Sequence, residues 1–164
     1  DAHLTVDQFK VDELTLTLAG HGGISVRNVA AEAVNISLAG HGSVSVDNLT
    51  ARSVDARLRG HGSVQIDGLD TASLAVRISG HGSVEVSCSA QTQMLNVRGQ
   101  GDYFADELES DVATVAISGR GRAHLWVRSA LTVDEMQEGT VRYRGTPVLH
   151  YLGAGPADAF GTLL

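Results

Sequence analysis

Apolar and polar residues alternate with a period of two in short runs along most of the chain. One run precedes each of several Gly-x-Gly pairs, and a second, shorter run follows the pair. The alternating apolar residues before the pairs are Leu14, Leu16 and Leu18; Val34, Ile36 and Leu38; Val54, Ala56 and Leu58; and Leu74, Val76 and Ile78. Those after the pairs are Ile24 and Val26, Val44 and Val46, Val64 and Ile66, and Val84 and Val86. This period, with many β-branched residues, predicts strands buried on one face, and no repeat unit shows a helical period.

The Gly-x-Gly pairs recur at a nearly constant spacing. They begin at Gly20, Gly40, Gly60, Gly80, Gly99 and Gly119, which gives steps of 20, 20, 20, 19 and 20 residues. Parallel coils stacked in register place equivalent residues about 4.8 Å apart, whereas an antiparallel meander needs no such phasing. The spacing therefore predicts an all-β fold, a right-handed parallel β-helix (β-solenoid) with about 20 residues per coil.

One domain accounts for the whole chain of 164 residues. We expect a single β-solenoid over residues 1–164, with regular coils over about 14–120 and irregular coils and a cap over 121–164. The end of a solenoid exposes core and strand edges, which must be covered. The apolar tail could be that cap, or it could join two copies of the chain, as could the solenoid ends. Its candidate contact residues are Tyr151, Leu152, Phe160, Leu163 and Leu164.

The parity of the alternation places the glycines at a structural corner. Because Leu18 points inward, residues 20 and 22 also fall on inward positions, where a bending backbone leaves no room for a side chain. The predicted corner glycines are Gly20, Gly22, Gly40, Gly42, Gly60, Gly62, Gly80, Gly82, Gly99, Gly101, Gly119 and Gly121.

The residue between the two glycines points outward. This predicts one exposed column of His21, His41, His61 and His81, continued by Gln100 and Arg120. Two neighbouring imidazoles could bind one Zn²⁺, Ni²⁺ or Cu²⁺ ion, but four in a line cannot converge on a single ion. The alternative is a stacked surface column that binds no metal, so that no cofactor is required. In either case the column gains charge below about pH 6, and we expect lower stability or altered assembly there.

The corner sequence and a later segment resemble a known family. Gly-x-Gly-[Ser/Asp]-Val corners and "GTVRYRGTPV" at 139–148 are similar to the bacterial putative auto-transporter adhesin, head GIN domain family. Its members repeat Gly-Ser-Gly-Asp-Val and end in Val-x-Tyr-x-Gly-x-Pro, which Val141, Tyr143, Gly145 and Pro147 match. The resemblance covers roughly 14–155. It implies a right-handed β-helical domain of the bacterial envelope with no established catalytic residues. Here histidine replaces the usual serine in four corners.

Composition excludes several classes of function. The net charge of −7 argues against nucleic-acid binding, and no apolar run is long enough for a membrane-spanning helix. The single cysteine, Cys88, cannot form an internal disulfide. It occupies the turn position of Asn28, Asn48 and Gly68, which predicts a free, partly exposed thiol that could cross-link two chains.

Charged residues form two further columns. Asp47 and Asp67 are equivalent in adjacent coils with Glu85 near, and paired carboxylates serve glycosidases, but no aromatic residue flanks them to stack on a sugar. Arg57 and Arg77 stack, with Arg59 and Arg98 near; they could contact acidic glycans or phosphate, or balance surface acids such as Asp55.

The sequence favours a protein that is not an enzyme: a non-catalytic cell-envelope β-solenoid with a structural or adhesin-like role, whose partner is a cell-surface glycan or protein. A metal-binding or pH-responsive module built on the histidine column is the alternative. A polysaccharide-active β-helix enzyme comes third.

Overall fold

The chain forms an all-β solenoid, seen in a computed structural model that describes residues 2–136, 138–152 and 160–161. No helix occurs in these ranges. The strands are β1 (Ala2–Val6), β2 (Phe9–Gly20), β3 (Gly22–Gly40), β4 (Ser43–Gly60), β5 (Ser63–Gly80), β6 (Ser83–Gly99), β7 (Asp102–Gly119), β8 (Arg122–Met136), β9 (Thr140–Arg144), β10 (Val148–Tyr151) and β11 (Phe160–Gly161).

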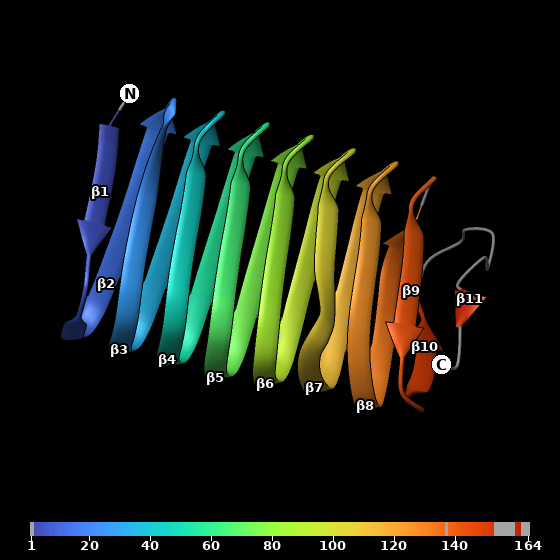
Figure 1. The fold of residues 1–164 in the computed structure, drawn as a ribbon. Coiled ribbons are helices and arrows are strands. Elements are labelled where there is room, and N and C mark those ends of the chain that lie inside the picture. The colour runs from blue at the N-terminus through green and yellow to red at the C-terminus, as the bar shows by residue number, and fades with distance from the viewer. Residues whose placement is uncertain (1, 137, 153–159, 162–164) are drawn as a thin grey trace.

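The strands stack in parallel, one coil on the next, in about seven turns (Figure 1). We number the coils 1 (2–20), 2 (21–40), 3 (41–60), 4 (61–80), 5 (81–99), 6 (100–119) and 7 (120–138). β1 and β2 together make coil 1, since both pair with β3, and the ladder thus extends to Ala2. The predicted parallel solenoid of about 20 residues per coil is confirmed.

The alternating apolar residues fill the inside of the coils. Leu38, Leu58, Ile78, Val97 and Ile117 form one such column, and none of them is more than 1% exposed. Burial of an aliphatic side chain stabilises a fold by about 1.5–3 kcal/mol relative to leaving it in water. Because such columns run from coil to coil, the buried apolar residues form one continuous core.

The two glycines of each corner have different tasks. Gly60 has a φ of +112°, and a Cβ there would lie 2.6 Å from the carbonyl oxygen of Gly40 in the preceding coil. A Cβ on Gly62 would lie 2.5 Å from the carbonyl oxygen of Gly42 in the preceding coil and also 2.6 Å from Cδ2 of Leu38 in the core. The parity argument placed both glycines inward, but only the second meets the core as well as the coil before it; the first meets that coil alone.

The turn after the first strand of each early coil also has a left-handed backbone. Asn28, Asn48 and Gly68 have φ values of +51°, +55° and +67°, a conformation that asparagine and glycine tolerate best. The Asn48 amide donates a hydrogen bond to Oδ1 of Asn28 at 3.2 Å. Asparagines stacked in this way link neighbouring coils outside the core.

The register first changes at this turn in coil 5, which is where the 19-residue step arises. Ile66 pairs with Val86, but Leu69 pairs with Cys88, so that Ser87 alone replaces two residues of coil 4. Cys88 is free and exposed, as predicted, and shares the positive φ of the turn at +98°. Its equivalence to Gly68 was wrong, however, because the ladder pairs it with Leu69.

Coils 5 and 6 also carry polar side chains inside the core. The amide of Gln93 donates to Oγ of Ser110 at 2.6 Å, and the Tyr103 hydroxyl donates to Oε1 of Gln93 at 3.0 Å. Ser110 in turn donates to the carbonyl of Trp126. Burial raises the pKa of the Tyr103 hydroxyl well above its usual range, so that it stays protonated and can act as the donor. Each polar group in this series of hydrogen bonds therefore has a partner.

The largest register change lies between β7 and β8. Ala105 pairs with Leu125 and Glu109 with Trp126, which leaves residues 106–108 without partners on β8. Regularity is thus lost before residue 120, where the sequence placed the change. Tyr151 and Leu152 of the tail are exposed. Leu163, Leu164 and the side chain of Phe160 lie outside what the structure describes.

Candidate functional site

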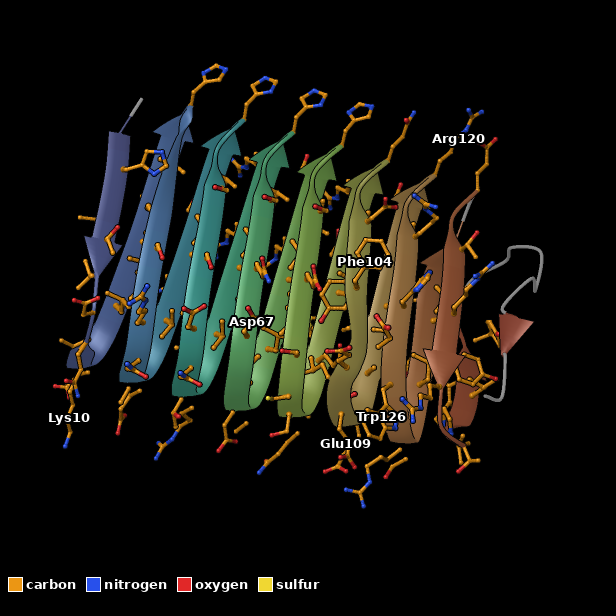
Figure 2. The ribbon with its side chains drawn as sticks, viewed as in Figure 1. Lys10, Asp67, Phe104, Glu109, Arg120 and Trp126 are labelled. Carbon is orange, nitrogen blue, oxygen red and sulfur yellow. The ribbon has the colours of Figure 1, made fainter. Side chains whose placement is uncertain are left out.

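The four corner histidines stack along one edge of the solenoid. The ring centroids of His21 and His41, and of His41 and His61, lie 5.0 Å apart, and those of His61 and His81 lie 4.8 Å apart. The ring planes differ by only 3–4°. We call this row the histidine column; it runs along the edge that also carries Arg120 (Figure 2). The corner backbone sets its spacing, since the His61 amide donates to the carbonyl of Gly40 at 2.9 Å.

Stacking at this spacing bears on metal binding. In parallel rings, equivalent nitrogens are separated by about the centroid distance of 4.8–5.0 Å. Two Zn–N bonds laid end to end span only about 4.2 Å. A bound ion would therefore require one ring of a pair to turn out of the stack. Among the described residues, no three His, Cys, Asp or Glu side chains come together to hold a metal ion.

The predicted acidic column is present but is engaged in surface pairs. The ladder pairs Asp47 with Asp67, while Glu85 pairs with Gln65 one column away. Nε of Arg27 lies 3.9 Å from Asp47, and the Gln65 amide donates to Asp67 at 3.1 Å. These carboxylates therefore balance neighbouring polar groups and form no isolated acid–base pair.

The predicted arginine column is also formed, on the second strand segment of coils 3 to 5. Arg57 pairs with Arg77 in the ladder, and Arg59 and Arg98 flank Ser79 in the column nearer the glycine corner. The four side chains line a groove of about 430 Å³, which we call the arginine groove. Asp55 accepts hydrogen bonds from Arg57 at 2.8 Å and from Arg77 at 3.0 Å.

A longer groove follows the corner opposite the histidine column. Its volume is about 580 Å³, and it extends from Ala31 in coil 2 to Arg128 in coil 7. Small residues such as Ala51, Thr71 and Ala90, all buried, form its floor. Its rims carry charged and polar side chains, namely Thr50, Arg52, Asp70, Gln91, Glu109 and Asp111. We call it the axial groove, because equivalent positions of successive coils line it.

Sequence reasoning missed a pocket beside the break in register. It measures about 450 Å³, and its lining includes Asp106 and Glu107 from the unpaired segment and Arg142, Tyr143 and Arg144 from β9. His124 and Tyr143 also line it. Two further aromatic rings contact its lining residues: Phe104 meets His124 edge to face at 5.3 Å, and the Arg144 guanidinium lies 4.7 Å from the centre of the Trp126 ring. The sequence did contain a signal for this change. No Phe, Trp or Tyr occurs between Phe9 and Tyr103, so that the return of aromatic residues at Tyr103 marks a different part of the solenoid.

Comparison with known proteins agrees with this architecture. No curated protein matches the chain. Across the described ranges, no helix has the length and apolar character needed to cross a bilayer. The family described as "Putative auto-transporter adhesin, head GIN domain" matches residues 1–68 and 35–147. The two matches overlap at residues 35–68 and together cover residues 1–147. The chain therefore belongs to the putative auto-transporter adhesin, head GIN domain family.

Proposed function

We propose that this chain is a non-catalytic, adhesin-like domain of the bacterial cell envelope that holds a cell-surface glycan or protein against its side. The axial groove carries the proposal. It passes over six coils, its floor is made of small side chains, and both rims offer hydrogen-bond donors and acceptors. Such a shape accepts an extended chain lying parallel to the solenoid axis.

The family supports a surface role without catalysis, since its description is that of an adhesin head. The charges of the groove support binding as well. Arg128 lies 3.2 Å from Glu109 and 3.8 Å from Asp111, so that these rim charges hold one another in place. A rim that is ordered before binding loses less side-chain entropy when a partner docks.

The test is binding to immobilised bacterial glycans and envelope proteins, with release of reducing sugar measured in parallel. We expect binding without sugar release. Ala72→Trp fills the axial groove and should abolish binding, whereas Ser45→Trp, on another face, should not. Release of reducing ends, or equal binding by both variants, would overturn the proposal.

A second candidate function is a response to pH through the histidine column. The stacking of the four rings supports it, because positive charges held 4.8–5.0 Å apart would repel one another. A metal-binding role requires the column to leave this stack. Titration with Zn²⁺ or Ni²⁺ of the wild type and of a variant with four His→Ser changes tests that role: equal behaviour excludes it.

A further inference from the structure

Positive charge is concentrated in the arginine groove of an otherwise acidic chain. The protein carries 12 Lys and Arg residues against 19 Asp and Glu, with a net charge of −7. Four of the 12 basic residues line this one groove of about 430 Å³. They are Arg57, Arg59, Arg77 and Arg98.

The groove is not neutralised by the protein. Within the described residues, Asp55 is the carboxylate in contact with it, and it serves both Arg57 and Arg77. No ion pair involves Arg59 or Arg98 in the part of the chain that the structure describes, so four positive charges meet one negative charge. Elsewhere carboxylates match arginines more evenly, as in the pairs of Arg122 with Asp102 and Arg120 with Glu138.

Like charges closer than about 8–10 Å repel one another even in physiological salt. The fold gains nothing from this repulsion, and a bound anion would relieve it. Arg59 and Arg98 lie two coils apart, which is about 10 Å at the usual spacing between parallel strands. They can thus contact two anionic groups along one polymer chain.

The side chains also suit particular anionic groups. A guanidinium presents a planar fork of N–H donors that matches a carboxylate or sulfate with two parallel hydrogen bonds. Asp55 fixes the orientation of two of the forks through the bonds at 2.8 and 3.0 Å. Ser79 and Asn96, which also line the groove, offer a hydroxyl and an amide to neutral hydroxyl groups.

We propose that the arginine groove is a second binding site, separate from the axial groove, and that it binds an acidic polysaccharide carrying carboxylate or sulfate groups. Its lining contains no aromatic side chain on which a nucleic-acid base could stack. Its concave shape receives a polymer chain better than the flat surface of an anionic bilayer. The proposal does not depend on the function assigned to the axial groove.

The test compares two double variants that remove the same charge. Arg59→Gln with Arg98→Gln removes the two groove cations that form no ion pair with a described residue, and Arg27→Gln with Arg120→Gln removes two exposed cations that lie outside both grooves. Binding to polygalacturonate, dextran sulfate and neutral dextran of similar length is measured by surface plasmon resonance as salt is raised. We expect the wild type to bind the two acidic polymers, not dextran, and to bind more weakly as salt rises.

The groove variant should lose at least about tenfold in affinity for the acidic polymers, and the control less than about twofold. Arg59→Lys with Arg98→Lys keeps the charge without the fork and should lose an intermediate amount. Thermal melting verifies that each variant is folded.

Equal losses in the two Gln variants, or no binding to either acidic polymer, would overturn the proposal. Tighter binding to phosphatidylglycerol vesicles or single-stranded DNA would overturn it in favour of those ligands. The Ala72→Trp variant should bind the acidic polymers like the wild type, which separates this site from the axial groove.

Discussion

Coils 1 to 4 and coils 5 to 7 share one hydrogen-bonded ladder but differ in how strictly they repeat. Among coils 1 to 4 the paired residues are 20 positions apart, the core is almost wholly aliphatic, and the outside carries rows of identical side chains. In coils 5 to 7 the register changes, polar groups enter the core, and a pocket lined by charged side chains and by His124 and Tyr143 forms beside the break. Strict repetition therefore produces rows and grooves, whereas a break in register produces a pocket with mixed chemistry. Four sets of variants test this comparison.

The largest effect should come from the corner of a regular coil. In Gly80→Ala the new Cβ would lie 2.5 Å from the carbonyl oxygen of Gly60, at a φ of +123°. Gly20 has a φ of +98°, but a Cβ there meets no atom within 4 Å. We expect Gly20→Ala to cost about 1–3 kcal/mol, for the backbone conformation alone, and Gly80→Ala several kcal/mol in total. Urea unfolding measures both. Equal costs would show that contact between coils does not select the glycine.

The next effect lies in the core of the irregular coils. Gln93→Leu restores the kind of residue that stands at Leu74, but it leaves the buried Tyr103 hydroxyl without an acceptor. We expect a loss of about 1–3 kcal/mol in the free energy of unfolding. Adding Tyr103→Phe should recover most of it, because both members of the bond are then apolar. Gln91→Leu, on an exposed neighbour, is the control. A double variant less stable than Gln93→Leu would contradict this account.

A smaller effect concerns the histidine column of the regular coils. The folded state holds the four rings closer together than the unfolded chain does, so that any positive charge on them repels more strongly in the folded state. Lower pH should therefore favour unfolding, and Tm should fall by a few degrees more than in a variant with all four corner histidines changed to Ser. His150→Ser, outside the column, should behave like the wild type. An identical pH response of the four-fold variant and the wild type would refute the role of the column.

The smallest effect extends the asparagine turn by one coil. Gly68 has a φ of +67°, close to the values at Asn28 and Asn48. Gly68→Asn keeps this conformation, restricts the unfolded chain and adds an amide beside that of Asn48, whose side chain must shift because Oδ1 lies 2.8 Å from the new Cβ. We expect a gain of about 0.4–1 kcal/mol, seen as a small rise in Tm. A fall in Tm would mean that the Asn48 side chain cannot move.

Much of the regular half could be predicted from the sequence because one rule, the period of two within a period of 20, decides the orientation of each residue. That rule placed Leu38 inward and His41 outward, and it paired Arg57 with Arg77. It could not reveal that a Cβ on Gly60 would meet the previous coil, since parity describes only in and out. It also failed at Cys88, because a one-residue deletion does not show which residue of a turn is missing. The pocket at Asp106 depends on that same kind of information, namely the local register.

The direction of the bonds between coils has a mechanical consequence. β1 and β11 lie at opposite ends of the stack (Figure 1), and hydrogen bonds such as that from Ser63 to Gly42 point along the line between them. A pull on the two ends would load these bonds directly and open the outermost coil first. Each opened coil would release about 60 Å of extended chain in place of about 5 Å of stack. Under tension the domain would thus lengthen in steps, one coil at a time from its end, while the remaining coils kept their grooves intact.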